Sequence, residues 1–375
     1  MRYAAHNHEP PSIDRSDPMT THARPRLKVG LIGYGYAGKT FHAPLISAVP
    51  DLHLVAVASS DAAKVHADWP DVAVHATPAE LVARADLDLV VIATPNDTHH
   101  PLARAALLAG CNVVIDKPFT VALADARELV ALAHKRGLVL SVFHNRRWDG
   151  DFLTLRRLVD EGALGRVVEM TSRHDRFRPE VRQRWRESAG PGAGLWFDLG
   201  PHLVDQALQL FGPPRAITLA RDLTRDGALA DDWFHAHLRY DRLHVHLQAG
   251  MLVAASAPRF AVHGTAASFV KQGLDTQEDA LKAGVRPTWP PQPDWGIDPG
   301  PAALVARAGD GSAVTTPVAL QRGAHQACFA AVAAAIRKEG ANPVPPEEAL
   351  AVMGLIERGI ESAAQRRELE WTIQG

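Results

Sequence analysis

The sequence predicts an α/β domain built on a doubly wound parallel sheet, followed by an α+β domain with a large, open, mostly antiparallel sheet. Apolar runs alternate with helical segments over residues 27–147, as they do where parallel strands are joined by crossover helices. A glycine-rich turn directly follows the first of these runs. After residue 148, apolar and polar residues alternate over long stretches, which is typical of strands with one buried face.

The first domain is expected to contain strands that are buried on both faces, because their sequences are short, continuous apolar runs. These strands span residues 27–33, 52–60, 87–95, 111–118 and 138–145. Helices are expected between them at residues 78–85, 98–110 and 123–137.

The second domain is expected to begin with a helix over residues 151–162. Period-2 alternation predicts strands at residues 166–174, 215–223, 233–240 and 242–250. Residues 284–301 are too rich in proline for regular structure and predict a long loop. Two helices, at residues 324–340 and 346–367, are expected to follow.

Length and composition limit the classes of function. A chain of 375 residues is long enough for about two domains, and 46% apolar with 22% charged residues is a globular composition. A net charge of −2 argues against a dedicated nucleic-acid or membrane-surface binder. Cys111 and Cys328 are the only cysteines, so no disulfide framework is expected. We expect a cytoplasmic protein with neither nucleic acid nor membrane as a partner.

Three regions are expected along the chain. Residues 1–26 are rich in proline, histidine and charge and lack the apolar core of a secretory signal, so we expect a disordered tail. Residues 27–147 form the predicted nucleotide-binding domain. Residues 148–375 form the predicted domain for substrate binding and oligomerisation.

The glycine-rich turn fits two motifs with different chemistry. Gly33, Gly35 and Gly38 match G-x-G-x-x-G, the dinucleotide-binding fingerprint of a Rossmann domain. Gly33 and Gly38, followed by Lys39 and Thr40, also match G-x-x-x-x-G-K-T, the phosphate loop of ATPases and GTPases. The first motif implies redox chemistry and the second implies nucleotide hydrolysis.

The dinucleotide-binding interpretation explains more of the sequence. Asp116 ends an apolar strand, as the magnesium ligand does in phosphate-loop hydrolases, but Lys117 beside it would compete with the metal. Polar residues end several predicted strands, where open α/β sheets bind ligands. The residues predicted to bind the cofactor are Gly33, Gly35, Tyr36, Ala37, Gly38, Ser59, Ser60, Lys64, Thr94, Pro95, Asn96, His99 and Lys117.

Residue 59 bears on the choice of cofactor. NAD enzymes place an acid about 20 residues after the glycines, where it binds the ribose 2′-hydroxyl. Ser59 stands 21 residues after Gly38, and with Ser60 and Lys64 it suits the 2′-phosphate of NADP. Asp61 lies two positions further on and leaves NAD as the alternative.

The segment WFDLGPH supplies a candidate general base. Pro201 suits the first position of a helix that runs to Phe211, which would place His202 in the first turn and Asp198 just before it. A helix N-terminus disfavours imidazolium, whereas a nearby carboxylate stabilises it once the proton arrives. We predict that Lys117, Asp198 and His202 are catalytic. No metal is expected, because an Asp/His pair has fewer ligands than a zinc site requires.

Five segments together resemble the Gfo/Idh/MocA oxidoreductases, a family named for glucose–fructose oxidoreductase and inositol dehydrogenase. They are GLIGYGYAGKTFHAPLI, IATPNDTHHPLARAALLAG, VVIDKPF, FHNRRWDGDFLTL and DLGPH. The resemblance extends from residue 27 to the C-terminus. It is nearest to the NADP-preferring scyllo-inositol dehydrogenase-like members.

The resemblance implies a Rossmann domain, a second domain with a large open sheet, and an NADP(H)-dependent enzyme that oxidises a secondary alcohol of a sugar or cyclitol. It implies that Lys117 binds substrate and cofactor and that His202 accepts the substrate proton. The residues expected to bind substrate are Asn145, Arg146, Trp148, Asp198 and His202. Two activities of relatives remain alternatives: a regulatory protein that binds cofactor without turnover, and a hydrolase that uses bound nicotinamide transiently.

Two further clusters stand in the second domain. The segment RHDRFRPEVRQRWRE holds six arginines; Arg178, Arg182 and Arg186 would share a helix face, which favours a solvated or subunit-contact face over recognition of an anionic or heavily hydroxylated substrate. The pairs His235/His237 and His244/His246 would each lie on one strand face. A polar sheet face is favoured over a metal site, and the open sheet predicts a homodimer or homotetramer.

Overall fold

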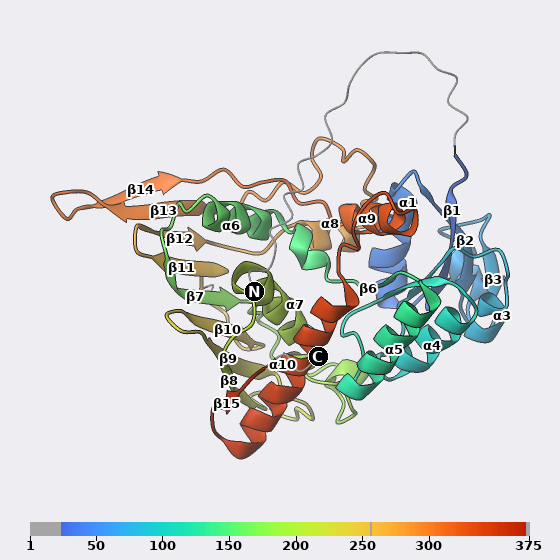
Figure 1. Ribbon diagram of the computed structural model, residues 1–375, viewed down its shortest axis with the longest axis horizontal. Helices are drawn as coiled ribbons and strands as arrows, with labels where there is room; N and C mark the ends of the chain where they lie inside the picture. Colours follow the sequence, from blue (N-terminus) through green and yellow to red (C-terminus); the bar gives the residue numbers. More distant parts are fainter. Residues whose placement is uncertain (1–23, 256, 373–375) are drawn as a thin grey trace, which may run out of the picture.

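The computed structural model describes residues 24–255 and 257–372, so most of the tail expected at residues 1–26 lies outside the described residues. The described residues form two sheets, one on each side of the molecule (Figure 1). The first sheet has six strands and the second has nine. No helix in the described part of the chain is long and apolar enough to cross a lipid bilayer.

The first sheet is parallel throughout and has the strand order β3-β2-β1-β4-β5-β6. This is the order of a Rossmann fold, and it confirms the doubly wound domain predicted from the sequence. The strand order reverses between β1 and β4, so a ligand crevice is expected at the carboxyl ends of these strands. The strands are β1 (Leu27–Ile32), β2 (Leu52–Ala58), β3 (Ala73–His75), β4 (Leu89–Ile92), β5 (Asn112–Ile115) and β6 (Leu140–Val142).

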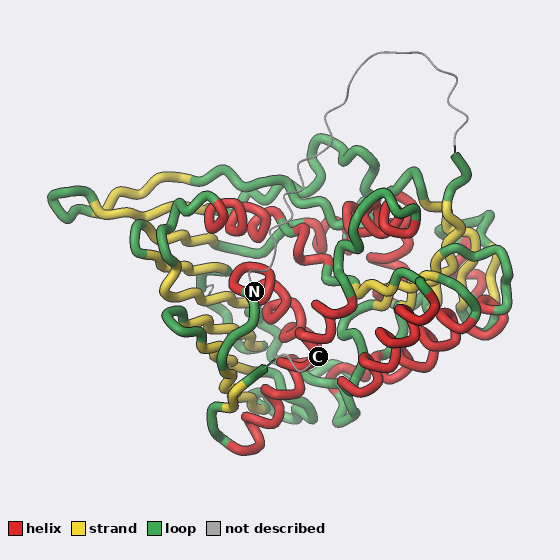
Figure 2. The backbone as a smooth tube through the Cα atoms, in the orientation of Figure 1, coloured by secondary structure: helices red, strands yellow, loops and turns green. Residues whose placement is uncertain are grey.

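Helices cover both faces of this sheet, which explains why its strands are continuous apolar runs. One apolar cluster joins the sheet to α1 (Ala43–Ala48) and α9 (Gln326–Ile336). The other joins it to α4 (His99–Leu108), α5 (Leu123–Arg136) and α10 (Pro346–Gln365). The C-terminal part of the chain therefore returns to pack on the first sheet, as Figure 2 shows for the helices at the centre of the molecule. Short helices α2 (Ala62–His66) and α3 (Pro78–Val82) complete the domain.

The second sheet has the order β14-β13-β12-β11-β7-β10-β9-β8-β15. Within this second sheet, β7 and β10 form the only parallel pair among the described strands, which confirms a large, mostly antiparallel sheet. The strands are β7 (Val167–Arg173), β8 (Ala216–Asp222), β9 (Trp233–Arg239), β10 (His244–Gly250), β11 (Phe260–Gly264), β12 (Ala267–Lys271), β13 (Ala302–Arg307), β14 (Ala313–Pro317) and β15 (Leu369–Glu370).

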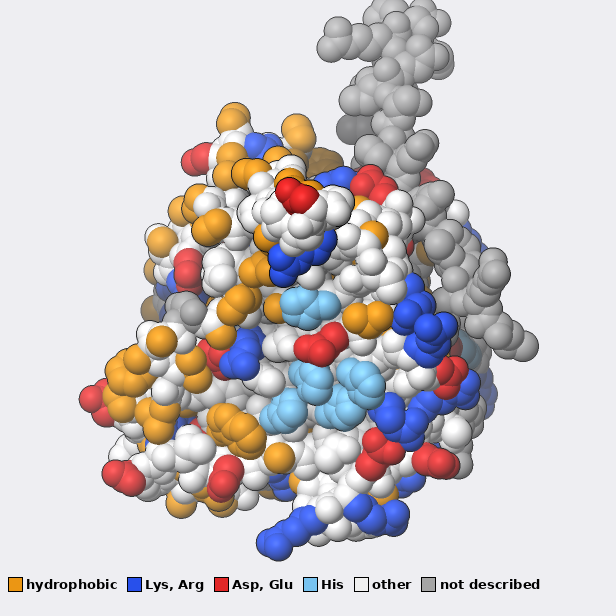
Figure 3. Space-filling model, turned by 90° about the vertical axis from the view of Figure 1, so that its left-hand side faces the viewer, with side chains coloured by type: hydrophobic (Ala, Val, Ile, Leu, Met, Phe, Trp, Pro, Cys, Tyr) orange, Lys and Arg blue, Asp and Glu red, His pale blue; other side chains and the backbone are white. Residues whose placement is uncertain are grey.

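One face of the second sheet packs on helices and the other does not. Helices α6 (Gly150–Asp160), α7 (Leu195–Phe211) and α10 share an apolar cluster with the inward side chains of the strands. The opposite face carries no described helix and turns toward the viewer in Figure 3, with histidine side chains at its middle. The short helix α8 (Gln277–Lys282) lies next to the first helical turn of the Rossmann domain.

Two expectations about local structure are wrong. Helix α7 begins at Leu195 rather than at Pro201, because Asp231 accepts hydrogen bonds from the backbone N–H groups of Leu195 and Trp196 at 2.7 and 2.8 Å. Pro201 therefore lies inside the helix, and His202 is not in its first turn. A cap supplied from a distant segment cannot be read from the local sequence.

The arginine-rich segment is not a helix, apart from the 3₁₀ turn Trp185–Glu187. It is extended, because the N–H groups of Arg176 and Arg178 donate to the carbonyls of Gly250 and Met251 at 2.9 and 2.7 Å. The shared helix face expected for its arginines therefore does not exist. The loop predicted at residues 284–301 is present, whereas strands β11 to β14 were not predicted.

Candidate active site

Glycines at two positions of the turn after β1 are required by its geometry. Gly33 has φ +96°, and a Cβ there would lie 2.6 Å from the carbonyl oxygen of Ala93. A Cβ on Gly38 would lie 2.0 Å from the carbonyl oxygen of Gly33, so the helix could not pack as closely. No atom lies within 4 Å of a Cβ built on Gly35. The turn therefore has the tight bend, the close helix packing and the open approach that a pyrophosphate requires.

A pocket of about 350 Å³ opens beside this turn. Its lining includes Gly33, Gly35, Ser59, Ser60 and Lys64, which are five of the residues predicted to bind the cofactor. The lining also includes Thr94, at the end of β4. The structure thus brings together strand ends that are far apart in the sequence, and they fit the adenosine half of a dinucleotide. Tyr36 and Ala37 do not line this pocket, and Tyr36 is 60% exposed, so cofactor binding by these two residues stays a prediction.

Asp61 stands at the N-terminus of α2. Its Oδ1 accepts a hydrogen bond from the N–H of Lys64 at 2.9 Å, so the carboxylate caps this helix. The hydroxyl of Ser59 accepts from the N–H of Asp61 at 3.1 Å. Ser59 stands closer to the end of β2 than Asp61 does. Oδ1 of Asp61 is already engaged in the hydrogen bond that caps α2.

The residues after β4 differ in what they offer a cofactor. The Asn96 amide donates to the carbonyl of Gly192 at 2.9 Å and so ties the strand end to the loop before α7. His99 is fully buried, with Nδ1 at 2.8 Å from the carbonyl oxygen of Pro118 and Nε2 at 3.0 Å from that of Thr94. Burial lowers the pKa of His99. We correct the expectation of direct cofactor binding by His99, because neither ring nitrogen is free and the imidazole instead joins the ends of β4 and β5.

Lys117 and Asp198 join the two domains. The lysine follows β5, and its Nζ donates to Asp198 Oδ1 at 2.9 Å and to the Asp198 carbonyl at 2.7 Å. The bond between Lys117 and Pro118 is cis. The predicted catalytic lysine and carboxylate thus lie in direct contact although 81 positions separate them in the chain.

Asp198 is surrounded by cations. Arg176 and Arg186 lie 3.7 and 3.6 Å from its carboxylate oxygens, in addition to Lys117. Burial would raise the pKa of Asp198, but the three cations outweigh it and hold the pKa well below the ordinary value. Asp198 is therefore ionised at neutral pH.

His202 follows Asp198 by four positions, so the two side chains share one face of α7. The imidazole is 6% exposed, and its buried Nδ1 has no hydrogen-bond partner among the described residues. Burial and the nearby charge of Lys117 lower the pKa of His202 well below its ordinary value. The ring is thus neutral at pH 7, although its place in the helix differs from the one expected.

Two other buried histidines lie near His202, and neither was given a catalytic or binding role of its own from the sequence. His144 follows β6, and burial lowers its pKa to about 4. Both of its ring nitrogens lack partners in the described part of the chain. His174 follows β7 and is 1% exposed, and burial together with Arg146 and Arg176 lowers its pKa. A histidine directly after an apolar strand was the available signal for both.

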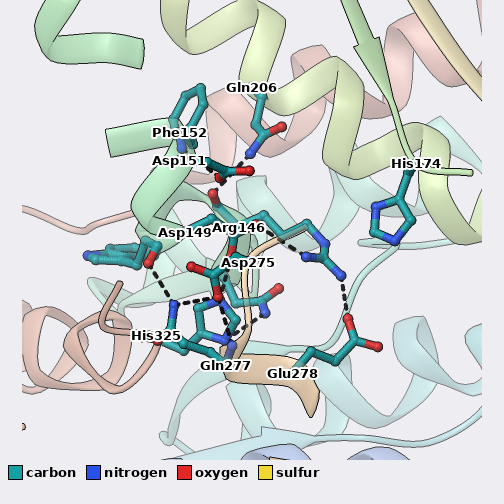
Figure 4. A network of polar contacts seen from close by, with 12 residues as sticks. Arg146, Asp149, Asp151, Phe152, His174, Gln206, Asp275, Gln277, Glu278 and His325 are labelled. Carbon is teal, nitrogen blue, oxygen red and sulfur yellow. Dashed lines mark hydrogen bonds and ion pairs between the residues drawn. The ribbon is translucent and has the colours of Figure 1, made fainter. Parts of the chain in front are cut away.

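The predicted substrate residues after β6 are held in a network of polar contacts (Figure 4). Arg146 is buried and pairs with Asp149 at 3.2 Å and with Glu278. Its two terminal nitrogens each donate to one carboxylate and its buried Nε has no partner among the described residues, so substrate binding by Arg146 stays a prediction. Asn145 Nδ2 lies 3.4 Å from His325 Nδ1. Trp148 packs between the apolar clusters of the first domain, and its carbonyl accepts two hydrogen bonds.

Asp149, Asp275 and His325 are close enough to hold a metal ion, with their ligand atoms within 4.8 Å of one another. Their polar atoms already have partners: His325 Nε2 is 2.6 Å from Asp149 Oδ1, and Asp275 accepts from the N–H groups of Gly150 and Gln277. These contacts account for the cluster as a structural network beside α6 and α8.

A larger pocket, of about 630 Å³, lies at the other end of α7, near Phe211 and Trp371. Thirteen residues of helix separate Asp198 from Phe211, which corresponds to about 20 Å. None of the residues predicted to act in catalysis or binding lines this pocket, so we place the chemistry at Lys117.

Comparison with known proteins agrees with this geometry. A model of the Gfo/Idh/MocA oxidoreductase family, NAD-binding Rossmann fold, matches residues 27–144. The model of the family's C-terminal alpha/beta domain matches residues 156–371. The chain belongs to the Gfo/Idh/MocA oxidoreductase family.

Characterised and uncharacterised members of the Gfo/Idh/MocA family are similar over nearly the whole chain. The uncharacterized oxidoreductase YdgJ of Escherichia coli K12 is 53% identical over 343 residues, which cover 92% of this chain and 98% of YdgJ. The scyllo-inositol 2-dehydrogenase (NADP(+)) IolW of Bacillus subtilis 168 is 37% identical, with coverage of 92% and 95%. The solved structure of YPO2259 from Yersinia pestis has a TM-score of 0.89 at 50% identity and covers 94% of this chain and 99% of its own.

Proposed function

We propose that this oxidoreductase interconverts a secondary alcohol and a ketone on a sugar or cyclitol, with NADP(H) favoured over NAD(H). The observation that carries the proposal is the direct contact of Lys117 with Asp198, one helical turn from His202. This contact joins a cation to a carboxylate after β5, and the neutral imidazole of His202 lies on the same helix face as the carboxylate. IolW, the relative named as a scyllo-inositol 2-dehydrogenase, supports the substrate class.

The residues of the turn after β1 fit a dinucleotide, because Gly33 and Gly38 allow its geometry and Gly35 leaves room for the pyrophosphate. Backbone N–H groups at the start of the following helix would hold the phosphates. The bound nicotinamide supplies the hydride acceptor or donor. The remaining steps fall to side chains of this chain.

Three side chains have distinct roles in this proposal. His202 takes the hydroxyl proton during oxidation, since its depressed pKa keeps the ring neutral before the reaction. Asp198 stabilises the imidazolium that forms, because a nearby carboxylate favours the charged ring. Lys117 donates toward the substrate oxygen and stabilises the negative charge that develops there. Asn145, Arg146 and Trp148 are proposed to bind substrate, and the ion pairs of Arg146 with Asp149 and Glu278 also fix the loop that carries them.

The preference for NADP rests on the end of β2. Ser59 and Ser60 line the pocket together with Lys64, and these groups suit a 2′-phosphate. Asp61 would repel such a phosphate, but one of its oxygens caps α2. The NADP dependence in IolW's name supports the same choice. We further propose a cytoplasmic homodimer or homotetramer that forms through the open sheet.

A substrate screen tests the proposed function. Polyols and aldoses are each incubated with NAD⁺ and with NADP⁺, and the reduced cofactor is followed by its absorbance. We expect formation of NADPH with at least one cyclitol or sugar. Binding of the dinucleotide without net reduction by any polyol or aldose would favour a regulatory protein. When an aryl glycoside is added to the screen, release of its aglycone without net reduction would favour a hydrolase.

A further inference from the structure

The arginine-rich segment after β7 lies over the active site rather than on a solvated helix. Arg176 and Arg186 approach the carboxylate of Asp198 from this segment at 3.7 and 3.6 Å. Their side chains are 16% and 24% exposed, so both guanidinium groups are withdrawn from bulk water. Arg178 is also partly buried in the same segment.

The segment is held in place by a buried guanidinium. Arg225 is 6% exposed and donates to the carbonyls of Arg178 and Glu180 at 3.3 and 3.0 Å. It also pairs with Glu187 at 3.0 Å and with Asp232 at 2.8 Å. The arginines over the site are therefore fixed by the fold before any ligand arrives, and fixed cations lose less entropy on binding an anion.

Arg176, Arg178 and Arg186 have more N–H donors than hydrogen-bond acceptors within reach. Both distances to Asp198 exceed 3.5 Å, which is beyond a hydrogen bond. In residues 24–255 and 257–372, the Arg178 and Arg186 side chains have no hydrogen-bond acceptor, while Arg186 stacks on the Trp185 ring at 4.5 Å. A guanidinium has five N–H donors. Several donors thus remain available next to Lys117.

The charges around Asp198 do not balance. Lys117, Arg176 and Arg186 surround the carboxylate of Asp198, while Asp116 lies near Lys117 and Arg186, and Glu278 lies near Arg176. Arg178 is a fourth cation, so four positive charges meet three carboxylates, and burial together with the neighbouring charges of Arg176, Arg182 and Arg184 lowers the pKa of Arg178. Like charges held together in a partly buried site oppose one another. An anionic group bound there would relieve this repulsion.

We infer that the substrate carries a carboxylate or phosphate group, which Arg176 and Arg186 bind beside the reacting alcohol. This inference rests on the proposed function and narrows the substrate class from neutral sugars and cyclitols to acidic ones. Planar guanidinium groups bind both oxyanions through paired hydrogen bonds. The pyrophosphate of the cofactor is a different anion, because its place is at the turn of Gly33 to Gly38.

Binding and turnover are measured separately, so that the two proposals can fail independently. Calorimetry on the protein saturated with NADP⁺ compares galactose with galacturonate and glucose with glucose 6-phosphate. We expect at least one acidic member to bind at least tenfold more tightly than its neutral counterpart, with an affinity that falls as salt is added. Equal or weaker binding of both acidic compounds overturns the inference. Turnover of neutral compounds alone would support the proposed function but not the inference of an acidic substrate.

Arginine variants distinguish anion recognition from mere support of Asp198. Arg176→Gln and Arg186→Gln should each reduce the preference for the acidic member of the pair about tenfold to a hundredfold, because a charge-assisted hydrogen bond is lost. Arg156→Gln on α6 removes the same charge from an exposed position and should leave the preference unchanged. If neither site variant alters the ratio of the two affinities, the arginines have only a structural role. NADP⁺ binding is measured for both variants, so that a variant that fails to fold is recognised and the other variant still tests the inference.

Discussion

Lys117 Nζ lies 2.9 Å from Asp198 Oδ1 and 2.7 Å from the Asp198 carbonyl oxygen. This contact joins the end of β5 in the Rossmann domain to the first turn of α7 in the second domain. The side chains proposed to be catalytic therefore assemble only when both domains are folded and docked.

Replacement of Lys117 tests the importance of this contact. Lys117→Ala should lower turnover at least a hundredfold, because it removes both a donor to the substrate oxygen and the nearest partner of Asp198. Steady-state kinetics with a substrate from the screen provide the measurement. Lys28→Ala, at an exposed lysine of β1 paired with Asp86, is the matched control and should leave turnover unchanged. Near-normal turnover in Lys117→Ala would remove the lysine from the mechanism.

The pH dependence of kcat/KM should shift in opposite directions when Asp198 and when Lys117 is replaced. The negative charge of Asp198 raises the pKa of His202, whereas the positive charge of Lys117 lowers it. Asp198→Asn should therefore move the acidic inflection of kcat/KM for alcohol oxidation to lower pH. Lys117→Met should move the inflection of its residual activity to higher pH. Since burial lowers the pKa of His202, the wild-type inflection should lie below about 6.5. Shifts of both variants in the same direction would contradict this electrostatic account.

Ser59 provides a test of the cofactor preference. Ser59→Asp should weaken NADP⁺ binding and favour NAD⁺ relatively, since an added carboxylate repels the 2′-phosphate and accepts from the ribose 2′-hydroxyl. Dissociation constants for both cofactors are measured by fluorescence titration, with Asp61→Asn as the companion variant. Tighter binding of NAD⁺ by the wild-type protein, together with its loss in Asp61→Asn, would show that Asp61 rather than Ser59 determines the choice.

Lys39 distinguishes the two motifs in the glycine-rich turn. Its Nζ pairs with Asp68 at 2.9 Å and is 43% exposed, so the ion pair contributes no more than about 1 kcal/mol to stability. Lys39→Ala should leave oxidoreductase turnover within a few-fold of wild type. Magnesium-dependent ATP hydrolysis that disappears in Lys39→Ala would instead support a phosphate loop.

The open face of the second sheet should bind another subunit. Imidazoles of His235, His246, His237 and His244 stack in that order, with ring centroids 4.8 to 5.4 Å apart. Thr171 lies on the same face, opposite His246 in the β7–β10 ladder. Thr171→Arg should reduce the mass in light scattering at micromolar concentration from that of a dimer or tetramer to that of a monomer. Asp160→Arg, at an exposed position on α6, should not. A monomeric wild-type protein would remove this prediction.

Local sequence was sufficient for the Rossmann domain and for the shared helix face of Asp198 and His202. Positions 33 and 38 require glycine for steric reasons, and the motif specifies glycine at both positions. The apolar runs are continuous because both faces of the sheet are buried. The D-x-x-x-H spacing encodes the shared helix face of Asp198 and His202. These features depend on residues that are close together in the chain.

Features that depend on distant residues were not predictable in this way. Asp231 sets the start of α7 from another segment, and the backbone after β10 pairs with the arginine-rich segment and keeps it extended. Glu278 forms an ion pair with Arg146 although 132 positions separate the two residues in the chain. The approach of Arg176 to Asp198 likewise follows from tertiary packing, so the sequence alone could not place that charge in the site.

The central claim is that His202 takes the substrate proton. A general base typically contributes 10²–10⁴-fold to the rate, so kcat of His202→Ala should fall by about that factor. Its NADP⁺ affinity should stay near wild type, because α7 is not the cofactor turn. His134→Ala, at an exposed histidine of α5, is the matched control and should retain full activity. The decisive measurement is kcat of His202→Ala under saturating NADP⁺ and substrate: a loss of at least a hundredfold supports the account, and retention of more than about a tenth of the wild-type value contradicts it.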